Sequence, residues 1–317
     1  MSPSSHQKPP PSVRLIALLA VLALGLVVIG CGGGDSDTKQ TDTIQTGASP
    51  AGLAIGGGGV WVTNAAGGTL ARIDPKLERV TGKPQQVGEQ PLYVAFGEGS
   101  VWTTAGRGSR VVRVDPRTGR KTKEVVPGPS PTGIAVGAGA VWVADGAESN
   151  VRRIDPATNK VVGRPIKVGL APEGVAFGEG AVWVANSGAA TVSRIDPDSK
   201  RVVATIRSGN APADIAVGEG GVWVANTSDQ TLVRIDPATN RAGEPIKLGG
   251  LPSGVAVGAG SVWVANLGNG TLQRIDPSSG DIVDTIKLLD HPAAVAVGEG
   301  AVWAAIPQSG TVARVEP

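Results

Sequence analysis

Short apolar runs alternate with small polar and turn residues along most of the chain, and they recur in groups of four. One copy reads "PSGVAVG" (252–258), "SVWVAN" (261–266), "TLQRIDP" (271–277) and "DIVDTIKL" (281–288). Each run has the length of a β-strand, is rich in Val, Ile and Thr, and is bounded by turn residues. The pattern therefore predicts four short strands per repeat.

The repeat length follows from the tryptophans, which are spaced 40 or 41 residues apart and stand at positions 61, 102, 142, 183, 223, 263 and 303. "GEG" or "GAG" in six of the seven copies suits a tight hairpin between the first two strands. Asp-Pro followed by Gly or Asn suits a type I turn with a bulge after the third strand. Four antiparallel strands repeated about every 40 residues are typical of a propeller blade, so we predict an all-β, seven-bladed β-propeller.

The two ends of the repeat region predict how the ring closes. The last copy stops at "TVARVEP" (311–317), after its third strand, and "DTIQTG" (42–47) resembles the fourth strands of other copies. An N-terminal strand that completes the seventh blade would remove the exposed edges of the ring. We therefore expect the propeller to span residues 42–317.

The N-terminus has the features of an export signal. Lys8 and Arg14 precede the apolar run "LIALLAVLALGLVVIG" (15–30), which is short for a membrane span. The run ends in "VIGC", which resembles the lipobox of bacterial lipoproteins. We predict a signal peptide at 1–30, a lipidated Cys31 and a flexible tether at 31–41. The domain would then be held by its lipid on the extracellular or periplasmic face of a membrane. An ordinary signal peptide and an uncleaved anchor are the alternatives.

Composition narrows the function. The chain has 41% apolar and 18% charged residues, which fits a folded domain, and its single cysteine leaves no internal disulfide. Removing Lys8 and Arg14 with the leader leaves 29 − 2 = 27 basic residues against 27 acidic ones. A balanced charge does not support nucleic-acid binding. We expect a monomer whose partner is a protein, a glycan or a small molecule.

Features present in every repeat are expected to serve the fold. The tryptophans are predicted to pack between neighbouring blades rather than to form an aromatic ligand platform. The arginine and acid of "RIDP" recur in all seven copies, with Glu316 as the last acid. We interpret the acids as turn-ordering groups and the arginines as side chains that lie along the sheet surface.

Residues that break the repeat are the candidates for a site. The loops from strand 4 to strand 1 and from strand 2 to strand 3 share one end of a propeller, which is where ligands usually bind. Most positions there are small, and the departures that we select as candidate ligand-binding residues are Tyr93, Arg107, Asp145, Glu173, Asp214 and His291. Tyr93 and Arg107 suit a planar or anionic ligand. Glu173 and Asp214 suit a cation such as Ca²⁺ or Mg²⁺. Exposed loops also vary without functional consequence.

The repeat "VWVANxxxxTVxRIDPxTxKVVATIxVGxxPxGVAVGEG" resembles YVTN-type and NHL-like propellers, and most closely the virginiamycin B lyase (streptogramin lyase) family. The resemblance covers essentially all of 42–317. It implies the fold, and it implies an enzyme that opens a cyclic depsipeptide by elimination with a metal ion, catalytic histidines and a glutamate at the mouth.

The sequence departs from this implied site. His291 is the only histidine left once His6 goes with the leader, so no histidine pair exists and we assign no catalytic residue. A binding module without catalysis is therefore the preferred reading. A metal-assisted enzyme of the lyase or lactonase type and a purely structural surface protein are the alternatives.

Overall fold

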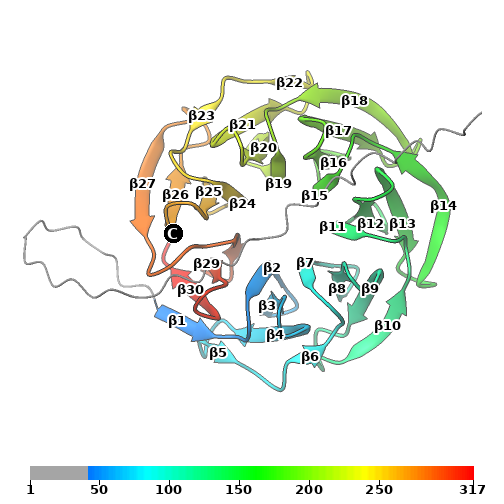
Figure 1. Ribbon diagram of the computed structural model, residues 1–317, viewed down its shortest axis with the longest axis vertical. Helices are drawn as coiled ribbons and strands as arrows, with labels where there is room; N and C mark the ends of the chain where they lie inside the picture. The colour runs from blue at the N-terminus through cyan, green and yellow to red at the C-terminus, as the bar shows by residue number, and fades with distance from the viewer. Residues whose placement is uncertain (1–41) are drawn as a thin grey trace, which may run out of the picture. The chain divides into compact units, whose positions relative to one another are not determined.

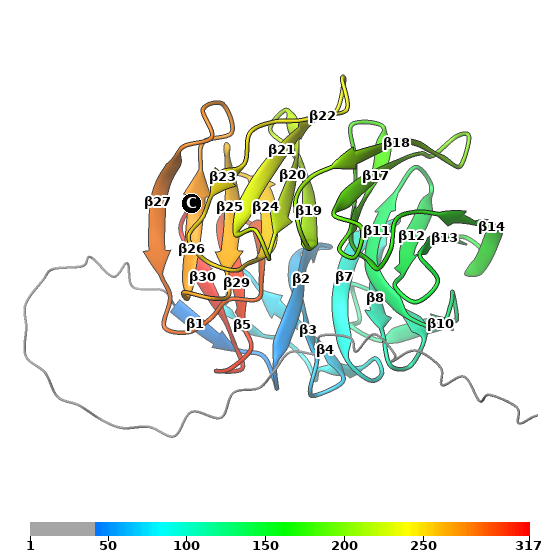
Figure 2. The same cartoon turned by 45° about the horizontal axis from the view of Figure 1, so that its top comes forward.

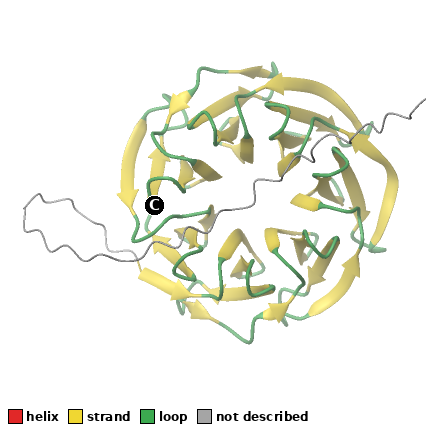
Figure 3. Cartoon of the chain, in the orientation of Figure 1, coloured by secondary structure: helices red, strands yellow, loops and turns green. Residues whose placement is uncertain are grey.

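The computed structural model describes residues 42–317, in which every regular element is a β-strand (Figure 3). Seven separate antiparallel sheets surround a common axis, so the predicted seven-bladed β-propeller is confirmed (Figure 1). No helix within this range is long and apolar enough to cross a membrane. Cys31 and the predicted segments 1–30 and 31–41 lie outside the described residues.

Each blade begins with a strand next to the axis, and these seven inner strands are β2 (Pro50–Gly56), β7 (Pro91–Gly97), β11 (Pro131–Gly137), β15 (Pro172–Gly178), β19 (Pro212–Gly218), β24 (Pro252–Gly258) and β28 (Ala294–Gly298). The second strands are β3 (Gly59–Asn64), β8 (Ser100–Ala105), β12 (Ala140–Asp145), β16 (Ala181–Asn186), β20 (Gly221–Asn226), β25 (Ser261–Asn266) and β29 (Ala301–Ile306). The third strands are β4 (Thr69–Asp74), β9 (Arg110–Val114), β13 (Asn150–Asp155), β17 (Thr191–Asp196), β21 (Thr231–Asp236), β26 (Thr271–Ile275) and β30 (Thr311–Val315).

The outer strands are less regular than the other three. Four blades have a continuous one: β10 (Lys121–Val125), β14 (Lys160–Lys167), β18 (Arg201–Arg207) and β27 (Ile282–Lys287). Blades 1 and 5 instead have two short pieces each: β5 (Arg79–Val80) with β6 (Gln85–Gln86), and β22 (Arg241–Ala242) with β23 (Ile246–Lys247). Pro84 and Pro245 stand in these breaks, and proline has no N–H to donate to a ladder.

The ring closes as the sequence predicts. β1 (Asp42–Gln45) pairs antiparallel with β30, with Asp42 opposite Arg314 and Gln45 opposite Thr311. The amide of Thr46 also donates to the carbonyl of Gly310 over 3.0 Å. The seventh blade is therefore built from both ends of the described chain.

The core consists of seven interfaces between neighbouring blades. All seven tryptophans are at most 1% exposed, and each packs on strands of the next blade. Trp183 of blade 4, for example, clusters with Val222 and Val224 of blade 5, and Trp303 of blade 7 clusters with Val60 and Val62 of blade 1. The predicted packing role of tryptophan is confirmed, and the last interface repeats the geometry of the others.

The repeated arginines cover the tryptophans. In blades 1–6 the guanidinium carbon lies 4.9–5.8 Å from the ring centroid of the Trp in the same blade. That distance suits a cation–π contact. Five of the tryptophans, Trp61, Trp142, Trp183, Trp223 and Trp303, also donate their indole N–H to the carbonyl of the glycine that ends the inner strand.

The two ends of the propeller differ in their connections, as the 45° turn in Figure 2 helps to show. We call one end the mouth: it holds the loops from outer to inner strands and from second to third strands. The other, the turn end, holds the first hairpins and the Asp-Pro turns. There the carboxylate of Asp74 accepts the amides of Lys76 and Leu77, and Asp236 accepts those of Ala238 and Thr239. The predicted turn-ordering role of these acids is confirmed.

Candidate functional site

The inner strands come so close together at the mouth that the third residue of each is usually glycine. A Cβ added at Gly133 would lie 1.9 Å from the carbonyl oxygen of Glu173 in the next blade, and one at Gly52 would lie 2.2 Å from that of Leu92. Tyr93 and Asp214 occupy this same position in blades 2 and 5. Both residues therefore bring a functional group to a place where the repeat has no side chain.

Asp214 links two blades. Its Oδ2 accepts the amide of Val255 in blade 6 over 3.0 Å, and its Oδ1 accepts the amide of Ile215 over 2.9 Å. Burial nevertheless raises the pKa of Asp214 to about 6, against the opposing effect of these two amides. A carboxyl group at the mouth therefore titrates close to neutral pH.

Glu173 lies on β15, in the blade before Asp214. Its Oε1 accepts a hydrogen bond from the hydroxyl of Ser187 over 3.0 Å, and Ser187 also donates to the carbonyl of Ala171. Burial raises the pKa of Glu173, the hydrogen bond from Ser187 opposes that rise, and the charge of Asp214 adds to it. The two carboxyl groups are thus electrostatically coupled across the interface of blades 4 and 5.

Tyr93 completes the group from blade 2. The side chain is partly buried and packs against the cluster around Trp102 and Ile134. Burial raises the pKa of the Tyr93 hydroxyl well above its usual value, and the charges of Glu173 and Asp214 raise it further. The structure therefore brings three of the six candidates into one electrostatic environment, although they come from three blades.

Asp145 lies apart from this group. It ends β12, is only 2% exposed, and accepts the amides of Ala147 and Glu148 with Oδ1. Its Oδ2 is buried without a hydrogen-bond partner. Asp145 stands where other blades carry an asparagine, and Asn64 and Asn226 use their side-chain amides to bond the preceding loop. The contacts of Asp145 thus order its own loop.

Arg107 and His291 also stand apart from Tyr93, Glu173 and Asp214. Arg107 is exposed in the loop between β8 and β9 and forms no hydrogen bond or ion pair with another described residue. The Nδ1 of His291 lies 2.5 Å from the carbonyl oxygen of Leu267, and its backbone amide donates to Asp290. The ring of His291 therefore contacts the loop between β25 and β26 at the mouth.

Hydroxyl groups that the sequence analysis did not single out join the blades at the mouth. Thr132 and Thr227 each donate to the proline carbonyl that begins the next inner strand over 2.7 Å, and Ser253 donates to the carbonyl of Pro292, just before β28, over 3.2 Å. Ser187 was also missed, because the equivalent positions of the other repeats vary in residue type and form no pattern. The only available signal was its pairing with a glutamate fourteen residues earlier, which becomes visible once the hairpin is folded.

A metal site of the kind implied by the resemblance does not fit these residues. Within 42–317 there is no group of three or more His, Cys, Asp and Glu side chains placed to hold a metal ion. The protein is thus a β-propeller with a small, partly buried acidic site at its mouth.

Comparison with known proteins identifies the family of the chain. The model of the virginiamycin B lyase family matches residues 36–315, and the protein belongs to this family. No curated protein sequence matches significantly.

Solved structures share the fold at low identity. A streptogramin B lyase superimposes with a TM-score of 0.75 and 18% identity over 87% of this chain and 96% of its own. A catalytically inactive histidine-to-alanine variant of virginiamycin B lyase from Staphylococcus aureus, with quinupristin, gives 0.75 and 18% over 88% and 100%. Hydrazine synthase from Kuenenia stuttgartiensis gives 0.75 and 17% over 90% and 99%. Proteins with such different functions share this fold, so these likenesses define the architecture alone.

Proposed function

We propose that this protein is a lipid-anchored, extracytoplasmic binding module that takes a cationic ligand at the mouth of its propeller. The observation that carries the proposal is the coupling of Glu173, Asp214 and Tyr93, which are the residues that break the repeat beside the axis. Partly buried groups with shifted pKa values at the end of a repeat scaffold are candidates for a binding site. A bound cation would favour the ionised carboxylates and so offset the energy of burying them.

Exposed apolar side chains at the same end suggest the rest of the ligand. Large aliphatic residues in or next to the loops that enter the inner strands are exposed in five blades: Leu92 (43%), Val126 (65%), Leu170 (64%), Leu251 (39%) and Leu289 (86%). Apolar contact around a few polar groups is the usual composition of a ligand site. An organic cation with apolar substituents therefore suits the mouth better than a bare metal ion.

The direction of β1 indicates how a lipid anchor would orient the propeller relative to the membrane. Asp42 pairs with Arg314 near the turn end, and Gln45 pairs with Thr311 at the mouth. Cys31 stands eleven positions before Asp42. A lipid on Cys31 would tether the domain by its turn end and leave the mouth facing away from the membrane. Metabolic labelling with a fatty-acid analogue tests this anchor, and loss of the label in Cys31→Ser is the expected result.

Calorimetric titration of the purified chain with a panel of apolar ammonium compounds and Ca²⁺ tests the binding function. We expect an apolar ammonium compound to bind at pH 7.5 and to bind up to about tenfold more weakly at pH 5, where Asp214 is mostly protonated. Glu173→Gln should weaken binding, whereas Glu89→Gln, a change of an exposed carboxylate at the same end, should not. If no cation binds, or if both variants behave alike, the proposed site is wrong.

Membership in the virginiamycin B lyase family favours a second candidate, ring-opening elimination of a cyclic depsipeptide. His291 would be the only histidine available within 42–317, and its Nδ1 already meets a carbonyl oxygen. Incubation with quinupristin, followed by chromatography that separates the linear from the cyclic form, tests this directly. We expect no linear product; turnover that is lost in His291→Ala would establish the enzyme instead.

A further inference from the structure

A groove with positively charged walls separates blades 1 and 2 at the turn end, which is the opposite end of the propeller from the acidic mouth. Two adjoining cavities of about 240 and 450 Å³ share Lys83, Thr118 and Gly119 in their lining. Arg72 and Arg117 line the first cavity, and Arg120 lines the second. We call this feature the basic groove and define it by Arg72, Lys83, Arg117 and Arg120.

The groove is open because the outer strand of blade 1 is interrupted. Residues 81–84 separate β5 from β6 and run as a loop at the rim in Figure 1. Gly82 has a φ of 69°, which favours glycine, and Pro84 cannot donate to the ladder. Lys83 stands between them and is exposed. The break therefore presents a lysine at the edge of the groove.

Blade 5 has the same kind of break and provides an internal comparison. There residues 243–245 separate the two pieces, one residue fewer, and Glu244 stands before the proline where blade 1 has Lys83. A Cβ added at Gly280 in the turn of blade 6 would lie 3.2 Å from the Cδ1 of Ile246. One added at Gly119, the equivalent residue of blade 2, would meet nothing within 4 Å. The interface of blades 5 and 6 is filled, and that of blades 1 and 2 is not.

Gln85 explains the difference in filling. It pairs with Leu70 as Ile246 pairs with Leu232, but its side chain bonds backbone groups: Oε1 accepts the amide of Lys121 over 3.2 Å, and Nε2 donates to the carbonyl of Gln86 over 3.1 Å. The space over Gly119 therefore stays free for a ligand.

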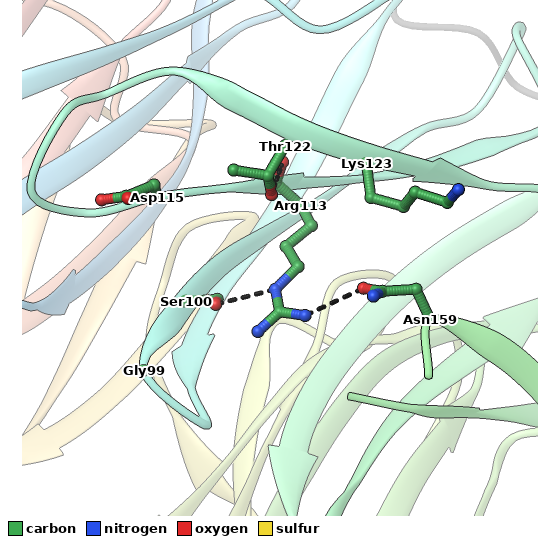
Figure 4. A pocket seen from close by; sticks show the side chains of 7 residues that line it. All are labelled: Gly99, Ser100, Arg113, Asp115, Thr122, Lys123 and Asn159. Atoms are coloured by element: carbon green, nitrogen blue, oxygen red, sulfur yellow. Dashed lines mark hydrogen bonds between the residues drawn. The ribbon is translucent and has the colours of Figure 1, made fainter. Parts of the chain in front are cut away.

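The repeated arginine of blade 1 also lacks the asparagine partner in the next blade that the arginines of blades 2 and 4 have. In blade 2, Arg113 donates to Asn159 in the turn of blade 3 over 2.9 Å (Figure 4). At the interface of blades 1 and 2, Gly119 takes the place of Asn159, and Arg72 donates back to Gly58 of its own blade. Arg72 also lines the first cavity. The floor of the groove thus carries a guanidinium that is not bonded to the neighbouring blade.

The other three cations of the groove also form no ion pair within the described range. Lys83, Arg117 and Arg120 are exposed, and none forms an ion pair with another residue of the described range. The nearest turn acid, Asp115, uses its Oδ1 to accept the amides of Arg117 and Thr118. Arg72 and Arg117 help to lower the pKa values of Asp74 and Asp115, but none of the four cations forms an ion pair with a described residue.

We propose that the basic groove binds a polyvalent oxyanion of the phosphate class, with Arg72 at the floor and Lys83, Arg117 and Arg120 at the rim. Arginine matches the geometry of phosphate oxygens through two parallel N–H donors, and lysine adds a mobile charge. The cations come from both blades, so an oligophosphate that spans the groove meets all of them. The site is independent of the mouth and of its ligand.

Calorimetric titration of the full chain with sodium tripolyphosphate at low and moderate salt tests the proposal. We expect binding that weakens as salt rises, and a loss of roughly tenfold or more in Lys83→Glu, which copies the residue of blade 5. Gln85→Ile, which copies Ile246, should abolish binding without changing the charge. Lys160→Glu, a change of an exposed lysine after the turn of blade 3, is the matched control and should bind as wild type.

The source of the phosphate is resolved with vesicles. Binding to phosphatidylglycerol vesicles that tripolyphosphate displaces and Lys83→Glu weakens would identify a lipid headgroup, and binding of tripolyphosphate alone would identify a soluble anion. Both results support the groove. Absence of tripolyphosphate binding, or equal losses in Lys83→Glu and Lys160→Glu, would overturn it. Melting temperatures of the variants, expected within a few degrees of wild type, verify that each is folded.

Discussion

Acidic side chains at the two ends of the propeller meet opposite environments. At the turn end, Asp74 and its counterparts recur in successive blades, are open to solvent, and have pKa values lowered first of all by hydrogen bonds from turn residues. At the mouth, Glu173 and Asp214 occur once each, and burial raises their pKa values. The same chemical group therefore stabilises the scaffold at one end and is held at a cost at the other.

This difference suggests a way to distinguish residues that serve the fold from residues that serve a function. A feature that every blade repeats can be explained by the blade, as the tryptophans and turn aspartates are. A buried acid present in one blade has no such explanation, although Asp214 also links two blades through Val255. The following predictions test how strictly this division holds, starting with the largest expected effect.

Deleting residues 42–47 should have the largest effect, because it removes β1 and exposes the edge of β30. Ile44 is 7% exposed and Thr46 is 5% exposed, so buried contacts are lost together with the ladder. We expect the free energy of unfolding to fall by on the order of 5 kcal/mol, measured by denaturant titration. Thr43→Ala, an exposed change in the same strand, is the control. An unchanged melting temperature after the deletion would contradict the closure.

Trp223→Ala tests the repeated core and should lower the free energy of unfolding by about 3–5 kcal/mol. The side chain fills the interface with Val262 and Val264 of blade 6 and reaches no group of the mouth site. Affinity for a mouth ligand, measured at a temperature where the variant is folded, should stay near that of wild type. A greater loss of affinity than of stability would mean that the tryptophans form a binding platform after all.

Asp214→Gly restores the glycine of the repeat and tests the mouth. The pKa of Asp214 is raised from 3.8 to about 6 in the folded state. Between pH 3.8 and about 6, the native protein therefore keeps a proton on Asp214 that the unfolded chain has released. Its contribution to stability is therefore present below about pH 4 and is lost as pH rises to about 6, by up to roughly 3 kcal/mol. Unfolding measured across this range should show a smaller decline in the variant.

Asp236→Asn, in a turn, is the matched control for that experiment. Its pKa is lowered by hydrogen bonds, so the stability that it contributes is present above about pH 4 and is lost on acidification below that value. The two variants should therefore alter the pH profile in different windows and with opposite signs. Identical profiles would remove the contrast between the two ends.

The smallest expected effect concerns the arginine contacts between blades at the turn end. Arg194 donates to Asn240 of the next blade, whereas Arg153 faces Lys200 at the equivalent place and has no such bond. Asn240→Gly keeps a residue suited to a φ of 57° and should cost about 1 kcal/mol. Lys200→Asn should gain a similar amount, measured by thermal unfolding. A loss of stability in Lys200→Asn would show that the contact does not depend on the turn residue.

Most of the fold can be predicted from the sequence because its signals are local and repeated. The period of the tryptophans gives the number of blades, and the unfinished last repeat gives the closure by β1. The split outer strands are harder to predict. Pro165 lies within the continuous β14, while Pro84 and Pro245 stand in breaks, so proline alone does not decide where a strand divides.

The candidate site is only partly predictable, because side-chain direction and ring geometry decide it. Departure from the repeat selects Glu173, Asp214 and Tyr93, but only the closed ring places blade 2 near blades 4 and 5. The same criterion selects Asp145, whose carboxylate is buried in its own loop. Departure from a repeat therefore locates unusual residues and does not say whether they face solvent or the chain itself.

The pairing of β1 with β30 also fixes an order of events. Thr46 and Gly310, which hydrogen-bond across this seam, are 264 positions apart. The first strand of the domain therefore has no partner until nearly the whole chain has been synthesised, and long-range contacts of this kind form slowly. A polypeptide that is threaded through a membrane N-terminus first would remain an open, unclosed arc throughout its passage. The ring would then close only after β30 has crossed as well.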